Sequence, residues 1–225
     1  MKVGDGLEIR ENGLRYIVQN NEAIVISADG QIPKDLLIPE HINGFPVTEI
    51  FKYAFQHSKL ETVSIPDTIT RIRTGAFLFS ESLQRVNILY DLNKKNRVLN
   101  IESLAFCACN QLSTFSAPNS VLNLEERSFV DCLKLQECLG EIKICENGAL
   151  YNCPKLKKIV FTDGATIRRN SLCRNDKLQR VEFRGFVDID EDVLKYLLSI
   201  CKIFCTQNSN IADLAYEGHE IKIVR

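Results

Sequence analysis

A small residue followed by Phe or Leu recurs along most of the chain at a nearly constant spacing. The small residue is Ala or Ser at positions 54, 76, 105, 128, 149 and 171, and Val at 193. The intervals are 22, 29, 23, 21, 22 and 22 residues, a period of about 23. A single copy of such a repeat cannot bury its apolar face, so neighbouring copies must stack. The repeat therefore predicts one elongated solenoid with a continuous core.

Each copy contains the same order of apolar positions. It reads I-x-x-I-x-x-x-A-F, a short spacer and then L-x-x-V-x-I, as in Ile69–Phe77 followed by Leu83–Ile88. The L-x-x-V-x-I segment predicts one short strand per coil with alternate residues directed inward. The I-x-x-I segment and the A-F pair are expected to form the opposite wall. The apolar positions of the I-x-x-I segments are Val47 and Ile50, Ile69 and Ile72, Val98 and Ile101, Val121 and Leu124, Ile142 and Cys145, Ile167 alone in the sixth copy, and Phe186 and Ile189 in the seventh. Val193, Leu194, Ile200 and Ile203 complete this degenerate last copy.

Two stretches of this pattern resemble a known family. Leu37–Ile50, which contains Ile42-Asn43-Gly44-Phe45-Pro46-Val47, and Ala54–Pro66 resemble the BspA-type, or Treponema pallidum-type, leucine-rich repeats. The resemblance covers roughly residues 37–204. It implies a leucine-rich repeat solenoid of the α/β class that is rich in β structure, right-handed and curved, with about seven coils and a parallel strand in each. Family members are mostly surface or secreted proteins of bacteria and protists that bind other proteins, and the family has no catalytic residues to carry over.

The ends of a solenoid need caps, because open strand edges pair with other molecules. Residues 1–36 are expected to form an N-terminal cap with a β-hairpin over 14–26, the repeats to occupy residues 37–204, and residues 205–225 to form a short C-terminal cap with a strand over 220–224. The long interval adds a polar loop at residues 90–97. This loop is interpreted either as a tolerated insertion or as a contact loop, because binding residues favour loops on rigid scaffolds.

The nine cysteines are interpreted mainly through the repeat. The residue four after the small residue is Ser80, Cys109, Cys132, Cys153 and Asn175 in successive coils. Stacking would align these thiols as small buried fillers, and Cys138 and Cys145 occupy apolar positions of the frame. The alternatives are a disulfide, or a metal or catalytic role, although no C-x-x-C pair or His partner at zinc spacing is present.

Charge and the N-terminal sequence bear on location. The net charge of −1 argues against attraction of the whole molecule to nucleic acid or anionic membranes. No signal peptide and no membrane-spanning segment are recognisable. Together with the unpaired cysteines, these features favour a cytoplasmic protein, whereas the family resemblance implies a secreted or cell-surface location.

No arrangement of residues typical of catalysis is found. The three histidines, His41, His57 and His219, are widely separated, and the common nucleotide-binding, hydrolase and zinc-protease motifs are absent. We therefore predict no enzyme activity and no cofactor. A basic run is interpreted either as a solvated patch that prefers acidic protein partners or as a nucleic-acid site, and the first is favoured because acidic residues interrupt it and no aromatic set accompanies it. Its members are Arg168, Arg169, Arg174, Lys177, Arg180 and Arg184.

The outward residues of the stacked strands are the candidate binding face. They are interpreted either as a solvated sheet surface or as a groove for a protein or peptide. The hypothesis is a non-enzymatic protein-interaction module, expected to be a monomer rather than an obligate oligomer. The alternative is a structural or adhesion segment of a larger cell-surface protein. The candidate residues are Thr62, Ser64, Arg85, Asn87, Thr114, Ser116, Glu137, Leu139, Lys158, Val160, Arg180 and Glu182.

Overall fold

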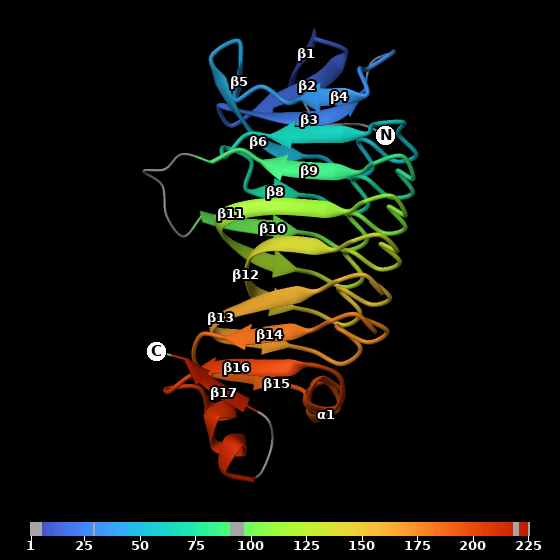
Figure 1. Ribbon diagram of the computed structural model, residues 1–225. Coiled ribbons are helices and arrows are strands. Elements are labelled where there is room, and N and C mark those ends of the chain that lie inside the picture. Colours follow the sequence, from blue (N-terminus) through green and yellow to red (C-terminus); the bar gives the residue numbers. More distant parts are fainter. Residues whose placement is uncertain (1–5, 29, 91–96, 218–220, 225) are drawn as a thin grey trace.

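The computed structural model describes residues 6–28, 30–90, 97–217 and 221–224. They form a β-solenoid of about eight turns with parallel strands and little helix, stacked along one axis (Figure 1). The prediction of a stacked solenoid is thus confirmed. Of the loop predicted at residues 90–97, residues 91–96 lie outside the described residues, as do His219 and Glu220.

The L-x-x-V-x-I segments form the first of two parallel sheets. Their apolar residues alternate inward, so Val63 and Ile65 are fully buried while Thr62 and Ser64 are turned outward. The strands, in order along the solenoid, are β4 (Asp35–Leu37), β7 (Thr62–Ile65), β9 (Arg85–Ile88), the first parts of β11 (Thr114–Leu124), β12 (Glu137–Cys145) and β13 (Lys158–Ile167), and then β14 (Arg180–Phe183), β16 (Lys202–Thr206) and β17 (Ile221–Val224).

The I-x-x-I segments form the second parallel sheet, so a typical coil contributes two strands and not the single strand predicted. Sheet pairing stabilises this wall as well, because every strand between the two ends of the sheet pairs with the coil before it and the coil after it. The strands are β3 (Glu22–Ala28), β6 (Phe45–Ile50), β8 (Arg71–Ile72), β10 (Arg97–Ile101), the second parts of β11, β12 and β13, and β15 (Val187–Ile189), while β5 (His41–Ile42) pairs antiparallel with β6.

The inward residues of this second sheet differ from the predicted ones in three coils. Leu99, Leu122 and Val187 are buried, whereas Val98 and Phe186 are 45% and 59% exposed. Val121 is half-buried. A regular strand alternates its side chains, so the inward residues are two apart and not three. The predicted spacing of three holds where the pairing is irregular, as at the register shift beside Ile142–Cys145.

The A-F segments form a third side that is hydrogen-bonded without being a sheet. The backbone N–H of Phe77 donates to the carbonyl of Ala105 at 2.7 Å, and that of Phe106 donates to Ser128 at 2.7 Å. Inside this wall, aromatic rings stack from coil to coil with centroids 4.9–5.1 Å apart, which adds to their burial energy. The stacked rings belong to Phe55, Phe77, Phe106 and Phe129.

Two residues in each of these turns have a left-handed backbone. One precedes the small residue, and the position includes Gly75, Gly148 and Asn170, which adopt this conformation easily, but also bulkier residues. The place in the coil therefore decides the conformation, whatever the residue type. The residues with positive φ at the two positions are Tyr53, Gly75, Leu104, Arg127, Gly148 and Asn170, and His57, Phe79, Ala108, Asp131, Asn152 and Arg174.

The aligned cysteine position is fully buried, as predicted, and it also supplies a hydrogen bond between coils. Each side chain donates to the carbonyl of the Phe or Leu of the preceding coil. All nine cysteines are free, so the disulfide alternative is not realised. The bonds are Ser80 Oγ to Phe55 at 2.7 Å, Cys109 Sγ to Phe77 at 3.1 Å, Cys132 Sγ to Phe106 at 3.2 Å, Cys153 Sγ to Phe129 at 3.2 Å and Asn175 Nδ2 to Leu150 at 3.0 Å.

The N-terminal end carries the predicted hairpin. Strands β2 (Leu14–Gln19) and β3 pair antiparallel, and β1 (Leu7–Glu11) adds a further antiparallel strand. The same β3 also pairs parallel with β6, through Val25 and Ile50. The hairpin therefore closes this end of the solenoid, and its strand β3 is also the first strand of the second sheet.

The C-terminal end departs from the repeat. Helix α1 (Glu191–Ile200) replaces the A-F turn of the last copy, and it buries Val193 and Leu197. Ile200, predicted to be an inward residue, is 37% exposed because the helical period places Leu197 inward instead. The 3-10 helix η1 (Asn210–Glu217) follows β16.

The open edge of β15 is closed by a side chain. The Oδ1 of Asn210 accepts from the backbone N–H of Val187 at 2.9 Å, and its Nδ2 donates to the carbonyl of Val187 at 2.9 Å. The amide thus occupies the place of a next strand, which reduces the tendency of a bare edge to pair with another molecule.

Candidate functional site

The twelve predicted residues lie in two columns on the outward face of the first sheet. In the first column the pairing continues from Thr62 to Arg180 without interruption. In the second it runs from Ser64 to Leu139 and from Val160 to Glu182. None of the twelve is buried. Both columns continue beyond the predicted residues onto β16, where Lys202 and Phe204 are in register with Arg180 and Glu182.

A hollow of about 440 Å³ opens in this face between β11 and β13. Four predicted residues line it, and the rest of its wall comes from the corner where the chain passes from the first sheet to the second. Its apolar lining includes Leu139, which is 46% exposed, and the half-buried Val160. The predicted residues are Glu137, Leu139, Lys158 and Val160, and the additional residues include Pro118, Asn119, Gly140, Glu141, Lys157 and Arg184.

The hollow exists because one coil is shorter than its neighbours. Cys145 follows Leu135 by ten residues, whereas the equivalent separation is twelve from Leu112 to Leu124 and eleven from Leu156 to Ile167. All six residues are fully buried, so the missing length is taken from the corner. The ladder between β12 and β13 is correspondingly interrupted between the pairs Glu137–Lys158 and Ile142–Phe161.

Gly140 allows the short corner to lie close to the preceding coil. Its φ of +153° is a conformation that favours glycine. A Cβ atom at this position would lie 2.8 Å from Leu122 Cδ1 and 3.2 Å from the carbonyl oxygen of Ala117. Only a residue without a side chain therefore fits the corner as it stands, and the space in front of it stays open.

The charges beside the hollow centre on one carboxylate. Glu182 forms ion pairs with Lys158 at 3.4 Å, Arg180 at 3.3 Å and Arg184 at 3.2 Å. Partial burial acts to raise the pKa of Glu182, but the hydrogen bond from Arg184 and the charges of Lys158 and Arg184 outweigh it and lower the pKa below its ordinary value. Arg184 also pairs with Glu141 across the hollow.

The next coil adds a cation–π contact to this cluster. The guanidinium of Arg180 lies over the ring of Phe204, 3.7 Å from the centroid. The contact fixes a positive charge on the outward face.

Comparison with known proteins identifies the family. The model of the BspA type leucine rich repeat region matches residues 48–138 and 89–201, in six copies. The chain belongs to the BspA-type leucine-rich repeat family. No curated protein shows a significant sequence match.

Solved structures with the same fold include other bacterial proteins. A leucine-rich cell surface protein from Faecalibacterium prausnitzii is 20% identical with a TM-score of 0.62, and the match covers 92% of this chain and 56% of that one. A leucine-rich repeat protein from Bacteroides ovatus is 17% identical with a TM-score of 0.55, covering 90% of this chain and 62% of that one. The chain thus spans little more than half the length of these two proteins.

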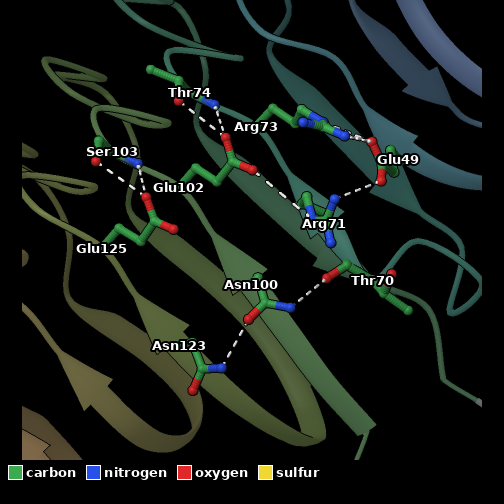
Figure 2. A network of polar contacts seen from close by, with 10 residues as sticks. All are labelled: Glu49, Thr70, Arg71, Arg73, Thr74, Asn100, Glu102, Ser103, Asn123 and Glu125. Atoms are coloured by element: carbon green, nitrogen blue, oxygen red, sulfur yellow. Dashed lines mark hydrogen bonds and ion pairs between the residues drawn. The ribbon is translucent and has the colours of Figure 1, made fainter.

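The outward face of the second sheet of this BspA-type solenoid is different, because its polar groups bind one another (Figure 2). Glu49 pairs with Arg71 at 3.0 Å and with Arg73 at 2.6 Å. Asn123 Nδ2 donates to Asn100 Oδ1 at 2.8 Å. These contacts run from coil to coil, so these polar groups are already bound within the solenoid.

Carboxylates at the end of the second-sheet strands bind the preceding turn. Glu102 accepts from the backbone N–H of Thr74 at 2.9 Å, and Glu125 accepts from that of Ser103 at 3.0 Å (Figure 2). Acidic residues at this repeat position therefore stabilise the stacking of the coils.

The basic run of the sequence does not form one patch. Arg168 pairs with Asp188 beside the second sheet at 2.9 Å, and Arg174 lies over the ring of Tyr151 on the turn side. Arg180 and Arg184 alone belong to the cluster around Glu182. Residues close in sequence are dispersed because one coil visits all three sides.

No catalytic or metal-binding cluster is found in the part of the chain that the structure describes. His41 lies in β5, and His57 is stacked on Phe79 on the turn side, with ring centroids 5.3 Å apart. Within the same residues, no group of three His, Cys, Asp or Glu side chains could hold a metal ion. No described helix has the length and apolar character needed to cross a membrane.

Proposed function

We propose that this chain is a non-enzymatic protein-interaction module that binds a partner through the outward face of its first sheet, with the hollow at β11–β13 as the centre. The observation that carries the proposal is a concave site lined by the exposed Leu139 and the half-buried Val160 together with charged residues such as Lys158. Interfaces gain most of their energy from such apolar centres within polar rims.

The contrast between the two sheets supports this choice of face. Second-sheet polar groups such as Glu49 and Asn123 are bound to neighbouring coils. On the first sheet, Glu137 and Arg85 form no ion pair or side-chain hydrogen bond with the described residues. Unpaired groups around an apolar centre are free to bind a partner, and they give specificity more than affinity.

A peptide-display selection on the immobilised protein tests the proposal. Leu139→Asp is expected to reduce the affinity of selected peptides at least about tenfold, because it places a charge at the apolar centre. Leu133→Asp is the matched control, since Leu133 belongs to the same coil, is 41% exposed and lies on the turn side. Equal loss in both variants, or in neither, would reject the site.

A second candidate function is a structural or adhesion segment of a larger cell-surface protein. It is favoured by the similarity to a leucine-rich cell surface protein, of which the chain covers 56%. In that case no peptide would be selected at the hollow, and binding would need the longer protein. The cell-surface location is tested on cells of the source organism with antibodies against residues 97–217. Antibody binding to intact cells that is lost after surface proteolysis would support this function, and no binding to intact cells would contradict it.

A further inference from the structure

We infer, on the basis of the proposed function, that the partner segment carries an apolar side chain for the hollow and carboxylate side chains for the coils that follow it. The ligand is thus an acidic peptide with an apolar anchor. The inference rests on the distribution of charge along the first sheet, which differs between its two halves.

Three cations are aligned beside the hollow. Lys158, Arg180 and Lys202 are paired in register on β13, β14 and β16. Adjacent strands lie about 4.8 Å apart, so the three positions fall within about 10 Å. Lys158 also lines the hollow, so the row of cations begins at the hollow itself.

The carboxylates nearby do not balance these cations. Glu182 serves Lys158, Arg180 and Arg184 together, and Glu141 pairs with Arg184 only. Lys202 forms no ion pair or side-chain hydrogen bond among the described residues. Among the residues that line the hollow or lie on the outward face of β14, β16 and β17, the basic ones are Lys157, Lys158, Arg180, Arg184, Lys202 and Lys222, and the acidic ones are Glu137, Glu141 and Glu182.

The other half of the face has no such excess. Lys34 forms an ion pair with Glu61 at 2.5 Å, and Thr62 Oγ1 donates to Asp35 at 2.5 Å. The outward residues that follow are mainly small and polar, such as Ser64. An acidic peptide would therefore be attracted to the half of the sheet that also holds the hollow, where like charges would disfavour a basic one.

The geometry limits how the peptide is arranged. Leu139 lies on β12, one strand away from Lys158 on β13, where the row of cations begins. An extended peptide rises about 3.3 Å per residue. Acidic residues are therefore expected to follow the apolar anchor within about three to four residues. A peptide that crosses the strands in this way meets Lys158 first and Lys202 last.

Fluorescence anisotropy with short labelled peptides tests the inference. One peptide carries a Leu followed by Glu residues, a second has Ser for the Leu, and a third has Lys for every Glu. We expect the first to bind tightest, with each change costing about tenfold or more in affinity and with binding that weakens as sodium chloride is added. Tighter binding of the Lys peptide, or equal binding of all three, would overturn the inference.

Protein variants locate the effect. Lys158→Glu and Lys202→Glu are expected to weaken the acidic peptide about tenfold each. Lys155→Glu is the control, because Lys155 is exposed in the same coil as Lys158 but precedes the strand. Unchanged binding in Lys202→Glu would contradict the proposed row. Binding of an oligothymidylate as tightly as the acidic peptide would also contradict it, because a general polyanion site would then be present.

The failure of this inference can be told apart from failure of the proposed function. If display yields neutral or basic peptides whose binding is lost in Leu139→Asp, the hollow is a binding site and only the acidic class is wrong. If no peptide depends on Leu139, the proposed function itself fails.

Discussion

The thiol of Cys132 donates a hydrogen bond of 3.2 Å to the backbone carbonyl of Phe106 in the preceding coil. The carbonyl also accepts from the backbone N–H of Cys109 at 3.2 Å. The thiol is therefore a second donor to a buried acceptor and not only a filler of space. Ser80 and Asn175 make the equivalent bond at either end of the row, which explains how Ser, Cys and Asn can all occupy this buried position.

Substitution of Cys132 tests this role. Cys132→Ser retains a donor, as in Ser80, whereas Cys132→Ala removes the donor and leaves a small cavity. We expect Cys132→Ala to lower the free energy of unfolding by about 1–2 kcal/mol, and Cys132→Ser to lower it less. Urea denaturation measures both. A serine variant less stable than the alanine variant would show that the hydrogen bond is unimportant.

Burial of the thiols makes stability depend on pH above the neutral range. Desolvation raises the pKa of Cys138 and of Cys145 to about 12, whereas the unfolded chain ionises at an ordinary thiol value. The unfolded state then binds fewer protons than the folded state, so this stability is fully present below about pH 8.5 and is lost as pH rises towards 12. Each thiol contributes a slope of up to about 1.4 kcal/mol per pH unit.

Urea denaturation between about pH 8 and about pH 11 measures this decline. The variant Cys138→Ala/Cys145→Ala, although less stable at neutral pH, is expected to lose stability less steeply. Parallel curves for the two proteins would contradict burial of these thiols.

The left-handed position before the small residue predicts opposite changes in the free energy of unfolding when a glycine is removed from one coil and introduced into another. Gly148, with φ +67°, and Arg127, with φ +55°, occupy the same place in successive coils. We expect Gly148→Ala to lower the free energy of unfolding by about 1–2 kcal/mol, and Arg127→Gly to raise it relative to Arg127→Ala by about 1 kcal/mol. Thermal and urea unfolding of the three variants measure these differences. Equal stability of the Gly and Ala variants at residue 127 would contradict the left-handed backbone conformation of this residue.

The amide of Asn210 gives a local prediction. Asn210→Ala removes both hydrogen bonds to Val187 and is expected to cost about 1–3 kcal/mol. Hydrogen exchange at the Val187 amide should accelerate, while exchange in β7 and β9 stays unchanged. Asn210→Asp keeps an acceptor for the N–H of Val187, so its effect on that amide should be smaller.

Much of the fold could be predicted from the sequence because the repeat is expressed in buried residues. The L-x-x-V-x-I segments and the aligned cysteine position follow from the repeat period, and the hairpin follows from two apolar runs on either side of the polar turn at residues 19–22. The second strand of each coil was missed because Val98 and Val121 continue the expected spacing although Leu99 and Leu122 are the residues turned inward. The helix α1 was not predicted because Val193 and Leu194 fall at the repeat positions of the A-F pair and were therefore assigned to another A-F turn.

The candidate site could be predicted only in part. Its two columns follow from the alternation of a strand, and the columns supplied Leu139 and Lys158. The hollow depends on the relative length of neighbouring coils, for which the interval of 21 residues between positions 128 and 149 is the signal. Arg184 and Glu141 could not be assigned, because their pairing joins positions 43 residues apart across the corner.

Hydrogen–deuterium exchange in the presence and absence of a selected peptide tests the central claim most directly. We predict protection in residues 116–121, 137–142 and 157–161, which surround the hollow, and no change in 97–101 on the second sheet. Protection confined to the second sheet or to the turn side, with the hollow unchanged, would contradict it.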